Sequence, residues 1–149
     1  MSRYDVNAAM IGGDGTDDTT VTVHTQATIT YADTSEHALE ATPTELTYYK
    51  NCKLRIPITY TGNPGDVNLT IGAATADIEL TGAQALAQFS SDFWTTKVID
   101  LNTSGGTSTF QELLEIDAAD INGQYLYTKY QYSGDPSNDP SVGVILSKV

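Results

Sequence analysis

The feature that most limits how this chain can fold is the stretch from Cys52 to Tyr60, CKLRIPITY. Apolar and polar residues alternate along it, which predicts a β-strand with one buried and one solvent-exposed face. Pro57 lies on the outer face and donates no backbone hydrogen bond, so we expect a sheet edge or a bulge there. The inward set is Cys52, Leu54, Ile56, Ile58 and Tyr60.

Alternating or β-prone segments recur along the rest of the 149 residues. The turn sequence GNPGD at 62–66 predicts that residues 52–61 and 67–73 pair as a hairpin. Turn signals about every 8–12 residues predict an all-β, antiparallel β-sandwich of about eight strands, either immunoglobulin-like or jelly-roll-like. Further strands are expected at 19–31, 76–80, 97–101, 110–116, 124–132 and 142–149, and short helices at 35–39 and 82–89.

The expected strand at 19–31 is unusually long and has a hydroxyl-rich outer face. Its alternation places Val21 and Val23 inward and His24 outward among the threonines. At about 3.3 Å per residue, so long a strand must either bend between two sheets or pair in part with another molecule.

The expected strand at 124–132 carries tyrosines on both faces. Tyr125 and Tyr127 lie opposite to Tyr130 and Tyr132 in the two-residue repeat. Large side chains on both faces predict a strand inside a sheet, with one face against the core and the other covered or contacting a partner.

Residues 1–18 differ in composition from the rest and predict a flexible arm. They are rich in glycine and aspartate, with Tyr4, Val6, Met10 and Ile11 as apolar anchors. We therefore expect an N-terminal arm at 1–18 and a single β-sandwich domain at 19–149.

The charge balance argues against several classes of partner. The formal net charge is −12, and the one basic cluster comprises Lys50, Lys53 and Arg55. Such a chain repels phosphate backbones and anionic membrane faces, so we expect no nucleic-acid and no membrane partner. Cys52 is the single cysteine, which excludes an internal disulfide, and its inward position predicts a buried apolar role.

The chain offers few groupings with catalytic or metal-binding chemistry. His24 and His37 lack ligand-spaced partners, and we expect no catalytic, metal or cofactor site. An acid-pair hydrolase would need Glu115 together with Asp117 or Asp120 in a cleft. The acidic loops at 14–18 and 135–139 contain enough oxygen ligands to leave calcium binding open.

Residues 114–127, LEIDAADINGQYLY, resemble the tyrosine corner of immunoglobulin-like sandwiches. Asp120, Gly123 and Tyr125 occupy the positions of the aspartate, glycine and tyrosine of that corner. One extra residue separates Asp120 from Gly123, and Tyr127 stands where an antibody domain has cysteine. The resemblance implies a sandwich, either of that family or of the viral jelly-roll type.

As a whole the chain resembles small virion proteins of tailed bacteriophages, the capsid decoration or cement class. The likeness lies in a short disulfide-free β domain, an N-terminal arm and Thr/Gly/Ser-rich loops. It implies a non-enzymatic protein, assembled into the virion in the host cytoplasm, that binds the major capsid or another virion protein and forms a homo-oligomer such as a trimer. The expected partner-binding residues are Tyr4, Met10, Ile11, Thr20, Thr22, Thr28, Thr30, Tyr125 and Tyr127.

The alternative is a carbohydrate-binding β-sandwich module of a tail or cell-surface protein. Aromatic side chains would then serve as stacking platforms, with loop carboxylates binding hydroxyls or calcium. The expected platforms are Tyr48, Tyr49, Trp94, Tyr125 and Tyr127.

Overall fold

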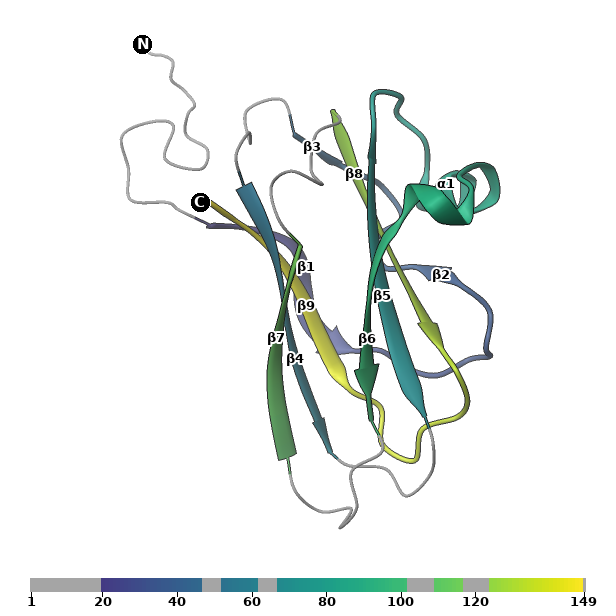
Figure 1. Ribbon diagram of the computed structural model, residues 1–149, viewed down its shortest axis with the longest axis vertical. Coiled ribbons are helices and arrows are strands. Elements are labelled where there is room, and N and C mark those ends of the chain that lie inside the picture. The colour runs from purple at the N-terminus through teal and green to yellow at the C-terminus, as the bar shows by residue number, and fades with distance from the viewer. Residues whose placement is uncertain (1–19, 47–51, 62–66, 102–108, 117–123, 149) are drawn as a thin grey trace.

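A computed structural model of the chain shows two antiparallel β-sheets facing each other (Figure 1). It describes residues 20–46, 52–61, 67–101, 109–116 and 124–148, with the backbone alone at 20, 21, 52, 53, 61, 109–116, 147 and 148. The all-β sandwich prediction is confirmed. The division into an arm at 1–18 and a domain at 19–149 stays a prediction.

The first sheet has the strand order β1-β9-β4-β7. Its members are β1 (Thr20–Thr28), β9 (Ser141–Lys148), β4 (Cys52–Thr61) and β7 (Thr109–Ile116).

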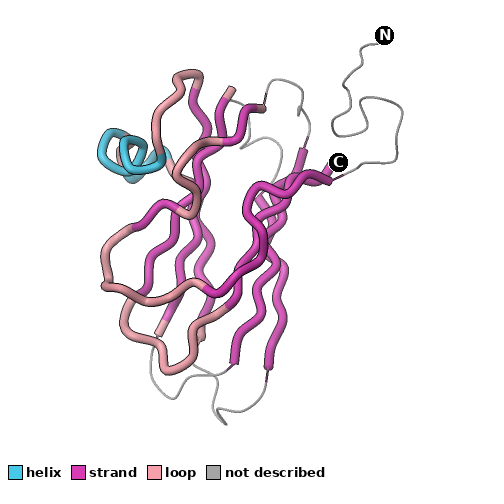
Figure 2. The backbone as a smooth tube through the Cα atoms, turned by 180° about the vertical axis from the view of Figure 1, so that it is seen from behind, coloured by secondary structure: helices cyan, strands magenta, loops and turns pink. Residues whose placement is uncertain are grey.

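The second sheet has the order β2-β8-β5-β6, with β3 also paired to β8. Its members are β2 (His37–Ala38), β3 (Thr44–Glu45), β8 (Tyr125–Tyr132), β5 (Asn68–Ala76) and β6 (Thr95–Asp100). Seen from behind, the strands again form two layers, with the helix outside them (Figure 2).

The pairing of the strands identifies the topology as a jelly roll. If β2 and β3 count as one interrupted strand, the described strands pair from the outside of the chain inward: β1 with β9, β2/β3 with β8, β4 with β7, and β5 with β6. The pairs β4·β9 and β5·β8 then join these ribbons into two sheets. A long antiparallel ribbon rolled in this way is the double-sheet jelly roll. The jelly-roll alternative is therefore the one that holds.

The predicted hairpin between residues 52–61 and 67–73 is wrong. β4 pairs with β7 and β9 in the first sheet, whereas β5 pairs with β6 and β8 in the second. Residues 62–66 therefore connect two sheets. A turn sequence predicts a reversal of direction, but it does not determine whether the strand that follows lies beside the previous one or across the core from it.

Three local predictions also need correction. β5 ends at Ala76, so the strand expected at 76–80 does not form, and the helix expected at 35–39 is replaced by β2. β4 lies inside its sheet, so Pro57 is not on an edge strand. The proline still interrupts pairing: the β4·β9 ladder skips from Arg55 to Ile58, while Pro57 stays opposite Leu113 of β7.

The core between the sheets contains the described side chains of the predicted inward set of β4, Leu54, Ile56, Ile58 and Tyr60. Leu54, Ile56 and Ile58 are at most 1% exposed. Burying each contributes about 1.5–3 kcal/mol, so this strand anchors the sandwich. The core also contains Val142, Val144 and Leu146 from β9 of the same sheet. On the side of the second sheet it contains Leu69, Ile71, Ile99, Leu101, Leu126 and Tyr132.

The predicted helix at 82–89 is confirmed as α1 (Gly82–Gln88). Thr81 and Gln84 form a capping box, in which each side chain accepts a hydrogen bond from the other residue's backbone N–H. A 3₁₀ turn, Ser91–Phe93, leads from α1 toward β6. Both elements lie in the connection between β5 and β6. The pairing of β6 with β5 begins after them, at Thr95.

Candidate functional site

Strand β1 forms one edge of the first sheet. Within the described residues it pairs with β9 alone. Thr22, Thr25 and Thr28 on this strand are exposed, as is Thr30 just beyond it. β1 ends at Thr28, so the strand is shorter than the 19–31 predicted, and the chain then reaches β2 of the second sheet through residues 29–36, which are not a strand. An edge strand presents backbone donors and acceptors to which another chain can pair.

Two register shifts interrupt β1, and they reorient its histidine. The register with β9 is regular from Thr20 to Thr22, then shifts between Thr22 and His24 and again between His24 and Ala27. A bulge adds one residue to one strand and turns the following side chains over. His24 consequently lies opposite the buried Val144 instead of facing outward, which corrects the predicted alternation.

The reoriented His24 bonds to a carboxylate from the β2–β3 connection. Its Nδ1 lies 2.5 Å from Glu40 Oε2, and the histidine side chain is 15% exposed. Because a carboxylate is an acceptor, this contact assigns the proton to Nδ1. Nε2 is buried and has no hydrogen-bond partner in the described structure. The pair ties β1 of the first sheet to the chain segment that borders the second.

A second histidine lies in an exposed cluster before β2. Asp33 Oδ1 accepts hydrogen bonds from the Ser35 hydroxyl (2.5 Å) and backbone N–H (2.8 Å) and from His37 Nε2 (2.8 Å). These bonds, those from Ser35 first, lower the pKa of Asp33 from 3.8 to about 2. The His37 ring also stacks on Tyr130, with 5.3 Å between the ring centroids.

The cluster contains the residue types of a hydrolytic triad but not its arrangement. In a triad, the aspartate and the serine contact different ring nitrogens, so that the imidazole relays a proton. Here Ser35 Oγ lies 3.3 Å from the same Nε2 that contacts Asp33. Both partners therefore compete for one nitrogen, and the arrangement fixes the turn at Asp33–His37 instead of activating the serine.

The outward side of β8 is covered near its start by an aromatic cluster. Tyr127 is 2% exposed and lies edge-on to Phe89, which follows α1, with 5.2 Å between the centroids. Its hydroxyl donates to Ile78 O (2.5 Å) and accepts from Leu80 N (2.7 Å). Tyr127 thus fastens the segment before α1 to the sheet. The ring is not accessible to a partner, so the partner surface proposed below does not include it.

Two residues further along the same side of β8, Lys129 is buried. Its ammonium forms an ion pair with Glu36 and lies 4.6 Å from the centroid of the Trp94 ring. Gly72 lies opposite it on β5, and a Cβ there would approach Lys129 Cε to 2.9 Å. A buried charge needs compensation of this kind, and the absence of a side chain at Gly72 leaves room for the lysine stem.

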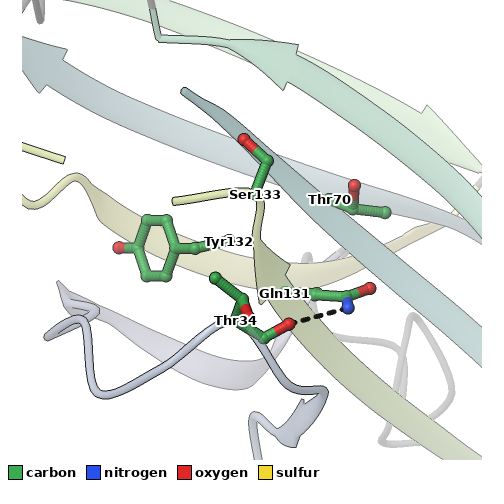
Figure 3. Close-up of a pocket in the computed structure, with 5 residues that line it drawn as sticks. All are labelled: Thr34, Thr70, Gln131, Tyr132 and Ser133. Atoms are coloured by element: carbon green, nitrogen blue, oxygen red, sulfur yellow. Dashed lines mark hydrogen bonds between the residues drawn. The ribbon is translucent and has the colours of Figure 1, made fainter. Parts of the chain in front are cut away.

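Further along again, the outer side of β8 is open to solvent. A hollow of about 390 Å³ is lined by Thr34, Thr70, Gln131, Tyr132 and Ser133 (Figure 3). Gln131 and Thr70 are register partners on β8 and β5. The Gln131 amide donates to Thr34 O at 2.9 Å. The Tyr132 ring belongs to the core, so the remaining side chains of the lining are hydroxyls and one carboxamide.

The structure describes only some of the predicted binding residues. Thr22, Thr28 and Thr30 are exposed, Tyr125 is half-buried, and Tyr127 is buried. Thr20 is the first residue of β1, with its backbone alone described. Tyr4, Met10 and Ile11 lie outside the described residues.

Other candidate groups are likewise only partly described. Asp117, Asp120, Gly123, Tyr48, Tyr49 and the 14–18 loop lie outside the described residues, and Glu115 and Cys52 are described by their backbones. Trp94 is 8% exposed, so it cannot serve as the predicted stacking platform. Asp135 and Asp139 are exposed. The described residues contain no group of three or more His, Cys, Asp or Glu side chains placed to hold a metal ion.

Sequence reasoning missed the two histidine–carboxylate pairs. Glu40 is 16 residues from His24, and only the bulges of β1 bring the ring to it. The Asp33–Ser35–His37 contacts are local, and their spacing of two and four residues could have indicated an Asx turn followed by an ion pair. None of the described helices has the length and apolar character needed to cross a bilayer.

Comparisons with known proteins find similarity among solved structures alone. No family model matches the chain, and no curated protein matches it. Among solved structures, the crystal structure of the infectious bursal disease virus VP2 subviral particle is similar, with a TM-score of 0.41 and 12% sequence identity. The similarity covers 87% of this chain and 31% of that chain, so the present chain spans about a third of the neighbour's length.

Proposed function

We propose that the chain is a non-enzymatic structural protein of a bacteriophage particle, a capsid decoration or cement protein. In this role it binds the outer surface of the head, through the major capsid or another virion protein, and stabilises neighbouring subunits. The observation that carries the proposal is the exposed, hydroxyl-rich edge strand β1. The jelly roll is compatible with it, since viral capsid proteins use this fold, but so do lectins and cupins.

The geometry of β1 limits where a partner can pair. Bulges blunt an edge strand because they break the regular spacing of its backbone groups. The longest regular run in the register of β1 is Thr20 to Thr22, next to the predicted arm, and a shorter one follows at Ala27 and Thr28. We therefore place the partner contact at residues 20–22 and the arm that precedes them. Thr28 and Thr30 lie at the edge of this contact surface.

The charge of the chain favours the outside of the head over its interior. A chain with a net charge of −12 is repelled by packaged DNA in the interior of the head. On the outer surface it does not have to lie against DNA. The virion location and a homo-oligomeric state, a trimer for instance, follow as parts of the same proposal.

Deleting residues 1–18 tests this assignment. The truncated chain and the full chain are each mixed with heads, lacking this protein, of the phage proposed to encode it, and co-sedimentation is measured. We expect the truncated chain to keep its thermal unfolding transition and to lose binding. Thr96→Val, on the far edge of the other sheet, is the matched control and should bind as the unaltered chain does. Undiminished co-sedimentation of the truncated chain would contradict the arm's role, and a full chain that does not sediment would contradict the decoration function.

A further inference from the structure

The open hollow on the outer side of the second sheet is formed by three separate segments. Thr70 comes from β5, Gln131 and Ser133 from β8 and the residue after it, and Thr34 from the connection between β1 and β2 (Figure 3). It thus lies between the sheet surface and the connecting segment that carries Thr34. Its volume of about 390 Å³ is toward the small end of the range for ligand pockets, about 300–1,000 Å³.

The connecting segment is fixed to β8 by three side-chain contacts, the first of which is the bond from the Tyr132 hydroxyl to Ile29 O. Gln131 donates to Thr34 O, and the buried Lys129 pairs with Glu36 two residues further on. The Asp33–Ser35–His37 bonds hold the turn between them. The wall of the hollow is therefore formed before any ligand arrives, which lowers the ordering cost of binding.

Several polar groups in the hollow have hydrogen-bonding capacity left. Ser133 Oγ accepts from Asn68 N at 2.8 Å, which leaves its O–H free to donate. In the described structure the hydroxyls of Thr34 and Thr70 and the carboxamide oxygen of Gln131 have no protein partner. Hydroxyls both donate and accept, and the carboxamide oxygen accepts, so the lining offers both roles within one small surface.

The chemistry of the lining selects against other ligand classes. An anion would require a cation, yet Lys129 is already paired with Glu36 and covered by Trp94. A metal ion would require a cluster of carboxylates or imidazoles, and the described residues that line the hollow include neither. An apolar ligand would leave the unpaired hydroxyls desolvated, which is unfavourable.

We propose that this hollow binds a neutral polyhydroxylated ligand, a sugar residue of a glycan, through Thr34, Thr70, Gln131 and Ser133. Sugar hydroxyls donate and accept as the lining does, and they carry no charge to be repelled by an acidic protein. The site differs from the aromatic platforms expected from the sequence, because Tyr127 and Trp94 are buried. The inference is independent of the proposed virion role. With one small, open site, millimolar dissociation constants are expected.

The test is a titration of the isotopically labelled full chain, followed by amide NMR shifts. The probes are methyl glucoside, methyl galactoside, methyl mannoside and N-acetylglucosamine, with glucuronate as the charged comparison. We expect at least one neutral sugar to give saturable shifts at the amides of Thr34, Thr70, Gln131 and Ser133, and glucuronate to give weaker ones. Failure of all four neutral sugars to saturate at high millimolar concentration, or shifts confined to other residues, would overturn the proposal.

A pair of threonine substitutions sharpens the test. Thr70→Val keeps the shape and β-branching of the residue and removes only the hydroxyl. Thr25→Val on β1 is the matched control in the other sheet. Loss of one neutral hydrogen bond predicts roughly fivefold to tenfold weaker binding for T70V and no change for T25V. Equal affinity of T70V and the unaltered chain would exclude the hollow as the site. The titration of the unaltered chain maps the site directly, so the test does not depend on the variant alone.

Discussion

Strands β8 and β1 both carry repeated hydroxyl-bearing side chains, yet they lie in opposite environments. β8 is inside its sheet, with Tyr132 in the core on one face and Tyr127 beneath α1 and Phe89 on the other. β1 is at an edge, with Thr22, Thr25 and Thr28 exposed and its register twice interrupted. The difference shows that large aromatic residues on both faces of a strand indicate double burial, whereas small hydroxyl-bearing residues indicate an exposed edge. A partner surface is therefore expected on β1 and not on the centre of β8.

The largest effect is expected at the inward face of β8. Tyr132 is 1% exposed, so Tyr132→Ala should lower the free energy of unfolding by about 3–5 kcal/mol through lost burial and the cavity left behind. Urea denaturation followed by circular dichroism measures it. Tyr132→Phe, which removes only the hydroxyl bond to Ile29 O, is the milder comparison. A loss below about 1 kcal/mol for Tyr132→Ala would contradict the placement of Tyr132 in the core.

A smaller loss is expected at the outward face of the same strand. Tyr127→Phe leaves Ile78 O and Leu80 N without their partner, which should cost about 1–3 kcal/mol. Tyr125→Phe, on the same face but half-buried, is the matched control and should change the unfolding free energy by less than about 0.5 kcal/mol. Equal effects of the two substitutions would show that Tyr127 does not fasten the segment before α1.

Alkaline pH should weaken the fold through β8. Burial raises the pKa of Tyr132 far above its usual value of 10.0, with smaller contributions from Asp139 and Tyr130. A raised pKa in the folded state means that the unfolded chain releases its proton first. Stability is therefore complete below about pH 10 and falls as the pH rises above it. Unfolding free energies measured across this range should fall more steeply for the unaltered chain than for Tyr132→Phe, and parallel slopes would contradict the prediction.

The smallest effect on stability is expected on β1. Thr22→Val and Thr28→Val replace exposed hydroxyls with groups of similar shape, and each should change the unfolding free energy by less than about 0.5 kcal/mol. The two variants should differ in capsid binding, because Thr22 lies within the longest regular run of the strand and Thr28 beyond both register shifts. Co-sedimentation measures the difference, and an equal loss for both variants would contradict the restriction of the contact to residues 20–22.

How much of the molecule the sequence predicts depends on the range of the interactions involved. Alternation in 52–60 predicted the buried face of β4, and the tyrosines of 124–132 predicted a strand covered on both faces, because both patterns reflect burial of the strand itself. The hairpin predicted around 62–66 was wrong because strand pairing here is between strands distant in the sequence. A turn sequence carries no information about such pairing.

The candidate sites were less accessible to sequence reasoning than the strands. His24 faces Glu40 because of two bulges. β1 contains no glycine or proline from which either bulge could have been predicted. The hollow joins Thr34, Thr70 and Gln131 through strand register, so no local motif could reveal it.

Hydrogen exchange on the full chain, free and bound to capsids, tests most directly whether β1 is the strand that receives a partner. We expect amides of residues 20–22 to exchange more slowly in the bound state, and amides of β8 to be equally protected in both states because they are already enclosed. Unchanged exchange along β1, together with new protection elsewhere on the molecule, would contradict it.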